Sequence, residues 1–290
     1  MNSLVINNTK IDSESPVYII AEIGINHNGD MNNVFKLIDI ASEAGCNAVK
    51  FQKRTPELAV PESEWDIRRE TPWGEMSYID YKRKIELSIP QYKEIDSYCK
   101  QKQITWFASC WDEQSVEQLA EINISCFKIA SASLTDFKTI SSMLKYDIPI
   151  IMSTGMSTFM EIKESVSMFE DRTIGLMHAT SSYPCPPEEL NLNMIKTLSN
   201  EFPNHIIGYS GHETGLSTTS VAVAFGAKIV ERHITLDRAM WGTDQSASLA
   251  PGGLRSLVGH IRTIEKSLGD GVKKVYDSEL SSRKKLRRDK

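Results

Sequence analysis

Two histidines in the last third of the chain have surroundings typical of a metal site. His212 in YSGHE and His233 in VERHIT each end an apolar run, and Asp244 follows soon after. Neutral imidazoles bind Mn²⁺, Fe²⁺ or Zn²⁺, and two such ligands leave coordination positions for water and substrate. A lone histidine at a strand end is more often structural, so we keep His27 and His178 only as residues that support the site. The pair predicts a divalent-metal or acid–base site.

Two lysines lie inside runs that are otherwise apolar, namely Lys50 in NAVKFQ and Lys128 in CFKIAS. Burying an unpaired ammonium group is costly, so each lysine requires an anionic partner. A bound phosphate or carboxylate would satisfy both lysines. An ion pair with a buried glutamate such as Glu22 is the structural alternative.

Short hydroxyl side chains accompany the lysines at the ends of the apolar runs. These serines are Ser109, Ser131, Ser153, Ser181 and Ser210. Each serine alone is an ordinary turn residue, but several hydroxyls together with free backbone N–H groups can surround an anion. The serines therefore shift the balance toward a site for a phosphorylated or carboxylated small molecule.

These residues must be positioned by the apolar, β-branched-rich runs that recur along the chain, each followed by turn residues and a helical periodicity. The predicted strands cover residues 17–23, 47–51, 104–108, 125–130, 148–152, 173–178, 206–209 and 227–233. Eight such units predict an α/β fold of the parallel (β/α)₈ TIM barrel type, in which functional groups gather at the carboxyl ends of the strands. A doubly wound open sheet is the alternative, but no GxGxxG turn follows the first run.

The connection between Gln52 and Ile104 is too long for a simple loop, because typical βα loops have about two to six residues. Its later part has helical periodicity, whereas its earlier part is rich in turn residues and includes Trp65 and Trp73. That earlier part is either a lid over the site or an excursion that packs on the barrel rim. The sequence leaves both open.

Composition excludes several classes of protein. A formal net charge of −5 disfavours a nucleic-acid partner. No apolar run approaches the roughly 18 residues that span a bilayer, and the first residues lack the pattern of a signal peptide. Five cysteines without a CxxC pair indicate reduced thiols. We therefore expect a cytoplasmic protein that binds neither membranes nor nucleic acid, and whose basic C-terminal run is a solvated end.

Several strings of the sequence resemble motifs of the sialic acid synthase family, whose members make nonulosonic acids from phosphoenolpyruvate. The strings are AEIGINHNGD, KFQ, KIAS, MSTGM, HATSSYP, YSGHE and ERHITLDRAMWGTDQSAS, and the likeness covers nearly the whole chain. The resemblance implies that phosphoenolpyruvate is held by Lys50, Ser109, Lys128, Ser131, Ser153, Ser181 and Ser210. It further implies that His212 and His233 bind manganese, with Mg²⁺ or Co²⁺ as alternatives, that Glu22 is an essential acid, and that Gln52, Tyr183 and Asp244 contact substrate.

The chain departs from the family pattern in two places. The KIAS motif is followed by Ala132-Ser133, where many relatives carry a carboxylate, and Asp136 is the candidate to replace it. Relatives also continue into a small antifreeze-like domain that contacts the acceptor sugar and the neighbouring subunit. We expect instead a barrel over residues 1–270 and a basic tail over residues 271–290, so the acceptor stays open and a homodimer would need contacts between barrels.

The resemblance predicts an enzyme that condenses phosphoenolpyruvate with an aldose such as N-acetylmannosamine. The products would be a nonulosonic acid and phosphate, released by C–O cleavage after a metal activates the aldehyde. A Schiff-base aldolase that uses Lys128 is one alternative. A non-catalytic sugar-phosphate sensor or scaffold subunit is the other.

Overall fold

Eight parallel strands close into a barrel in the computed structural model, which describes residues 2–169 and 172–288. The strands are β3 (Tyr18–Gly24), β4 (Ala48–Lys53), β7 (Thr105–Cys110), β8 (Phe127–Ile129), β9 (Ile150–Ser153), β10 (Gly175–Ala179), β11 (Ile206–Gly211) and β12 (Ile229–His233). β12 pairs in parallel with β3 and thereby closes the ring. The predicted (β/α)₈ barrel is confirmed, and each strand overlaps the run that predicted it.

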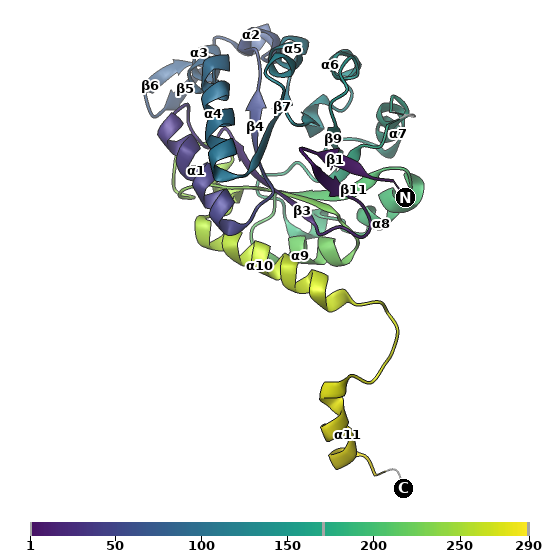
Figure 1. The fold of residues 1–290 in the computed structure, drawn as a ribbon. Coiled ribbons are helices and arrows are strands. Elements are labelled where there is room, and N and C mark those ends of the chain that lie inside the picture. Colours follow the sequence, from purple (N-terminus) through teal and green to yellow (C-terminus); the bar gives the residue numbers. More distant parts are fainter. Residues whose placement is uncertain (1, 170–171, 289–290) are drawn as a thin grey trace.

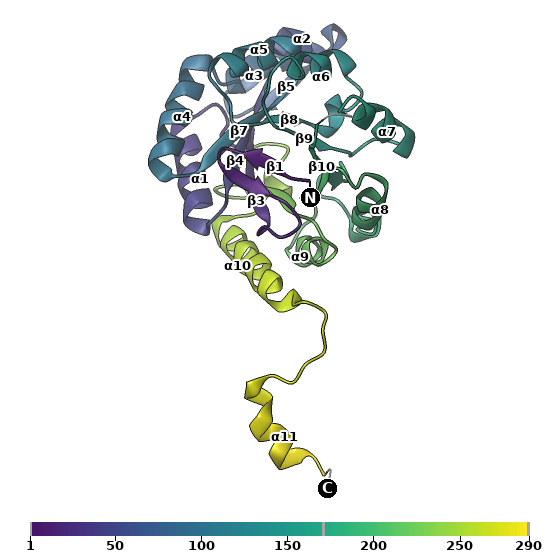
Figure 2. The same ribbon diagram turned by 45° about the vertical axis from the view of Figure 1, so that its right-hand side comes forward.

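Helices surround the barrel and complete the βα units (Figures 1 and 2). They are α1 (Met31–Ala44), α4 (Ile89–Lys102), α5 (Glu113–Glu121), α6 (Phe137–Met143), α7 (Phe159–Ser167), α8 (Met194–Glu201), α9 (Ser217–Ala224) and α10 (Pro251–Leu268). Local signals bound α1 as the sequence indicates. The Asp30 side chain accepts the backbone N–H of Asn32 at its start, and Gly45 ends it with a left-handed φ of 84°.

A β-hairpin that sequence patterns did not reveal precedes the barrel. It consists of β1 (Leu4–Ile6) and β2 (Thr9–Ile11), joined by two asparagines with positive φ. Ile6 and Ile11 are fully buried, and the Asn7 amide donates to Thr105 Oγ1 at the first residue of β7. The hairpin therefore lies against the amino end of the barrel, where Figure 2 shows β1 drawn across the centre of the ring.

The long connection after β4 has its own secondary structure. It contains α2 (Pro56–Ala59), the 3₁₀ turn η1 (Glu62–Glu64), the antiparallel pair β5 (Arg68–Thr71) and β6 (Gly74–Ser77), and α3 (Tyr78–Ile85). Trp65 donates its indole N–H to the carbonyl of Val60, and Trp73 is 40% exposed. Trp65 is thus bonded within the connection and Trp73 is partly exposed, and the choice between a lid and an excursion on the rim stays a prediction.

Beyond α10 the described chain leaves the barrel. It forms the 3₁₀ turn η5 (Asp277–Glu279) and α11 (Leu280–Leu286), which both views place away from the ring (Figures 1 and 2). Every residue from Gly269 to Arg288 is exposed, while Asp289 and Lys290 of the expected tail lie outside the described residues. The division into barrel and tail stays a prediction. In the described part of the chain, no helix combines the length and apolar character needed to cross a membrane.

Candidate active site

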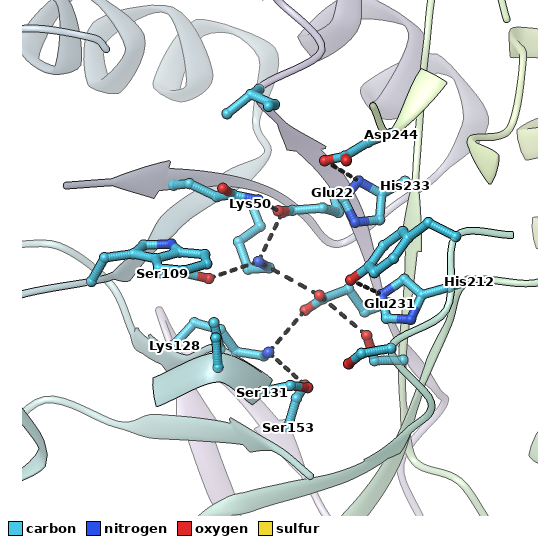
Figure 3. A pocket seen from close by; sticks show the side chains of 18 of the residues that line it. Glu22, Lys50, Ser109, Lys128, Ser131, Ser153, His212, Glu231, His233 and Asp244 are labelled. Carbon is cyan, nitrogen blue, oxygen red and sulfur yellow. Dashed lines mark hydrogen bonds and ion pairs between the residues drawn. The ribbon is translucent and has the colours of Figure 1, made fainter. Parts of the chain in front are cut away.

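A cavity of about 280 Å³ opens at the carboxyl ends of the barrel strands. All the site residues predicted from the sequence line it, namely Glu22, Lys50, Gln52, Ser109, Lys128, Ser131, Ser153, Ser181, Tyr183, Ser210, His212, His233 and Asp244. Figure 3 shows how the side chains of these strand ends converge. The fold therefore brings the predicted residues together, while their individual roles stay predictions.

Lys50 lies on the cavity floor among oxygen partners from β3, β7 and β12. Its ammonium is 2.9 Å from Glu22 Oε2 and 3.5 Å from Glu231 Oε1, and it donates to Ser109 Oγ at 2.9 Å (Figure 3). Parallel register places Glu22 beside Lys50 and His233 beside Glu22. Lys50 thus forms the ion pair with Glu22 that the sequence offered as the structural alternative, and its binding of a substrate anion stays a prediction.

Lys128 approaches the same carboxylate from the other side. Its ammonium donates to Ser153 Oγ at 2.6 Å and is 3.7 Å from Glu231 Oε2. Both lysines are almost fully buried, so each depends on these partners to remain charged. Glu231 consequently bridges the two ammonium groups.

Glu231 is the main residue of the site that sequence reasoning missed. It is buried on β12 and also accepts a hydrogen bond from Ser210 Oγ at 3.4 Å. Side chains alternate along a strand, so Glu231 shares the inward face with His233 two residues later. That alternation in VERHIT was a usable signal.

The buried carboxyl groups of Glu22 and Glu231 and the two buried lysines shift one another's pKa values. Burial chiefly, with a contribution from Glu231, raises the pKa of Glu22 to about 7, although Lys50 opposes this shift. Burial also disfavours the charge of Glu231, but the ammonium groups of Lys128 and Lys50 outweigh it and lower the pKa to about 2. Glu22 is therefore the carboxyl group that can exchange a proton near neutral pH.

Burial and the proximity of Lys50 lower the pKa of Lys128 to about 8, despite the opposing carboxylate of Glu231. Lys50 behaves in the opposite way, because Glu22 and Glu231 overcome the effect of burial and raise its pKa. The two lysines of the floor thus differ in character: Lys50 is firmly cationic, whereas Lys128 loses its proton more readily.

His212 and His233 lie next to each other, with ring centroids 5.7 Å apart. His212 Nδ1 is 2.7 Å from the carbonyl of Thr180, so that nitrogen carries the hydrogen. Its Nε2 lone pair then accepts the Tyr183 hydroxyl at 3.0 Å. Burial, reinforced by His233, lowers the pKa of His212 to about 4, so the ring is neutral.

His233 provides the test of whether a metal fits. Its Nδ1 is buried without a hydrogen bond, and the Asp244 carboxylate lies 4.0 Å away. Burial lowers the pKa of His233 as well, so both rings are neutral donors of the kind that Mn²⁺ or Zn²⁺ accepts. Within residues 2–169 and 172–288, no three His, Cys, Asp or Glu side chains form a metal-binding group. The histidines fit a cation that takes its other ligands from water and substrate.

The MSTGM motif gives the serines their close spacing. A Cβ added at Gly155 would lie 2.2 Å from Ser181 Oγ and 2.8 Å from Ser131 Oγ. The Gly155 N–H donates to Ser131 Oγ at 3.1 Å. Only glycine allows the two hydroxyls to approach this loop, which explains the residue type by packing alone.

Other candidates lie outside the cavity lining. Asp136 caps α6 by accepting the backbone N–H and hydroxyl of Thr139, so the expectation that it replaces the family carboxylate is wrong. His27 Nδ1 accepts the N–H of Gly29, and His178 Nε2 bonds to the carbonyl of Leu190. These contacts stabilise local loops.

Two cations at the cavity mouth were also missed. Arg54 follows β4, and Lys82 comes from α3 in the long connection; both line the cavity. Alternation from Gln52 was a signal for Arg54, but nothing local in the sequence places Lys82 there.

A model of the NeuB family matches residues 37–273 of the chain. The chain belongs to the NeuB family. It is 38% identical over 280 residues to the N-acetylneuraminate-9-phosphate synthase of Mus musculus, covering 95% of this chain and 78% of that protein. It is 37% identical over 268 residues to the N,N'-diacetyllegionaminic acid synthase of Campylobacter jejuni, covering 90% and 80%.

A solved NeuB relative has the same fold along its whole length. The N-acetylneuraminic acid (sialic acid) synthetase of Leptospira borgpetersenii, determined in complex with citrate, superposes with a TM-score of 0.87 at 32% identity. The match covers 99% of this chain and 98% of that one. The resemblance read from the strand-end motifs is confirmed.

Proposed function

We propose that this NeuB-family protein is a synthase that condenses phosphoenolpyruvate with an aldose to give a nonulosonic acid and phosphate. Relatives named as synthases of N-acetylneuraminate 9-phosphate, diacetyllegionaminic acid and pseudaminic acid support this reaction class. The observation that carries the proposal is the floor of the cavity, where Lys50 and Lys128 meet one carboxylate beside two neutral histidines. The relatives' names differ in the sugar, so they leave the acceptor open.

The proposed chemistry forms a C–C bond and a C–O bond and breaks one other C–O bond. C3 of phosphoenolpyruvate attacks the aldehyde carbon, the former aldehyde oxygen takes up a proton, and water adds at C2. The added water oxygen then loses its remaining proton and becomes the keto oxygen at C2, as the bond between C2 and the bridging oxygen breaks and phosphate leaves with that oxygen. A divalent metal held by His212 and His233 would act as a Lewis acid on the aldehyde.

The protein's own residues provide anion binding and a proton site. Lys50 and Lys128, with Ser131, Ser153 and Ser181, are positioned to hold the carboxylate and phosphate of phosphoenolpyruvate. Glu22 has a pKa near neutrality, so its protonation on substrate binding would release the Lys50 charge toward the incoming anion. The same carboxyl group can then give a proton to the former aldehyde oxygen.

Phosphate release from phosphoenolpyruvate, measured with a panel of aldoses and with or without Mn²⁺, tests the proposal. We expect turnover that requires both an aldose and the metal. Phosphoenolpyruvate labelled with ¹⁸O in the bridging position should transfer the label to phosphate. Label retained in the sugar acid would contradict C–O cleavage, and binding without turnover for every aldose would favour a sensor or scaffold.

A Schiff-base aldolase is the second candidate, because the lowered pKa of Lys128 favours a neutral amine. Borohydride reduction in the presence of a carbonyl substrate distinguishes the two. A covalent adduct on Lys128 would support the aldolase, whereas chelator-sensitive turnover without an adduct supports the condensation. The cytoplasmic location and the homodimer stay predictions.

A further inference from the structure

The cavity has a balanced floor and a positively charged mouth. On the floor, the two lysines face the two carboxylates of Glu22 and Glu231. Arg54 and Lys82 add two further cations to the lining on the side where β4 ends. Asp244 is the third carboxylate of the lining, so four cations face three carboxylates and the formal excess of one positive charge lies at the mouth.

Arg54 is held rigidly and is only partly satisfied. It is 5% exposed, its guanidinium lies 4.8 Å from the centre of the Trp111 ring, and it donates to the side-chain oxygen of Gln52. Its Nε has no hydrogen bond, and the nearest carboxylate oxygen, Glu86 Oε2, is 3.7 Å away. Glu86 also faces Lys53 at 3.4 Å, so one carboxylate serves two cations.

Lys82 has no carboxylate partner within ion-pair distance among the residues that the structure describes. Its ammonium lies 5.1 Å and 5.7 Å from the ring centres of Tyr78 and Tyr81. Burial and then Arg54 lower the pKa of Lys82 to about 8, and Asp244 offsets only part of this shift. The side chain is thus a partly desolvated cation close to a second one, an arrangement that an anion would stabilise.

The position of these cations separates them from Ser181, although Ser109 on the neighbouring strand pairs in register with Gln52. Arg54 follows β4, which stands across the closed ring from β10 and its Ser181. Arg54 instead borders Gln52. Tyr81 of α3 packs in a T-shaped contact on Trp241, with ring centroids 5.1 Å apart, in the loop that carries Asp244. The cations therefore adjoin Gln52 and the loop of Asp244, two of the positions predicted to contact substrate.

Resting on the proposed function, we propose that the acceptor aldose carries a phosphate group away from its aldehyde, and that Arg54 and Lys82 bind this phosphate. The arginine offers fixed N–H donors with a planar geometry that suits phosphate oxygens, and the lysine adds a point charge. The guanidinium is oriented in advance by its contacts with Trp111 and Gln52, and the backbone N–H of Arg54 is held by Glu86. This orientation limits the entropy lost on binding.

The test compares N-acetylmannosamine with its 6-phosphate as acceptors for the wild type, Lys82→Met and the control Lys84→Met. Lys84 is exposed, lies over the Trp73 ring at 4.9 Å and does not line the cavity. We expect the wild type to prefer the phosphorylated sugar by at least about tenfold in kcat/KM. K82M should reduce that preference about tenfold through the KM of the phosphorylated sugar, with the KM of phosphoenolpyruvate unchanged. K84M should behave as the wild type.

Three results would overturn the inference in distinguishable ways. Equal use of the two sugars by the wild type would remove the phosphate subsite but leave the synthase function intact. An effect of K82M on the KM of phosphoenolpyruvate alone would assign the cations to that substrate. Turnover with neither sugar would overturn the proposed function itself. The second variant is Arg54→Lys, which keeps the charge but loses the planar donors. It should selectively weaken the binding of the phosphorylated sugar.

Discussion

Arg232 and Glu213 form a buried ion pair, with Nη1 3.1 Å from Oε1, and each directly adjoins one of the two cavity histidines in the sequence. Arg232 also donates to the Thr219 hydroxyl and to the carbonyl of Glu213, while Tyr209 donates to the other oxygen of Glu213. This pair therefore ties the loop after β11 to β12 on the outside of the barrel. The sequence neighbours of this pair, His212 beside Glu213 and His233 beside Arg232, line the cavity on the inner side.

Replacing Arg232 by methionine should strongly destabilise the protein. The variant leaves the buried Glu213 carboxylate without its cation, which typically costs about 3–5 kcal/mol. The measurement is urea unfolding followed by circular dichroism. The matched control is Arg83→Met, whose exposed pair with Glu57 should contribute at most about 1 kcal/mol. Similar losses of unfolding free energy in the two variants would show that the buried pair stabilises the protein no more than the exposed pair does.

Glu22→Gln should change how stability depends on pH. The folded-state pKa of Glu22 is raised from 4.5 to about 7, chiefly by burial. Its contribution to the free energy of unfolding is therefore full below pH 4.5 and is lost as the pH rises through 7. Glutamine stays neutral throughout. Between pH 4.5 and 8 the wild type should therefore lose about 3 kcal/mol relative to E22Q. A stability difference that does not vary with pH would contradict the raised pKa.

Metal binding should depend on the two cavity histidines. Calorimetric titration with Mn²⁺ should show an affinity that falls at least about tenfold in His212→Gln and in His233→Gln, because each removes a neutral imidazole donor. His260→Gln, an exposed change on α10, is the control and should bind as the wild type does. Chelation should abolish phosphate release and added Mn²⁺ should restore it. Unchanged Mn²⁺ affinity in both cavity variants would show that the metal does not bind to these histidines.

Gly155→Ala should weaken phosphoenolpyruvate binding. The added Cβ meets Ser181 Oγ at 2.2 Å and Ser131 Oγ at 2.8 Å, so both hydroxyls must shift. We expect the KM for phosphoenolpyruvate to rise about tenfold, equivalent to about 1.4 kcal/mol of binding. Gly259→Ala has nothing within 4 Å of the new Cβ and lies within α10, so it should leave KM unchanged. Equal KM values for phosphoenolpyruvate in both variants would show that these serines do not bind that substrate.

The sequence alone determined the barrel and the inner ring of polar residues. Strands buried on both faces require continuous apolar runs, and a polar residue that interrupts or ends such a run is visible without coordinates. Lys50, Lys128, His212 and His233 were found in this way, and all four line one cavity.

The tertiary structure decided which charges meet. Closure of the ring sets β12 beside β3, so Glu231 reaches Lys50 and Lys128 from a distant part of the chain. Lys82 reaches the cavity only because α3 folds back over the mouth, and Asp136 turned out to cap a helix. Local patterns record which residues are buried, but the pairing of buried charges depends on distances between segments far apart in sequence, and packing alone sets those distances.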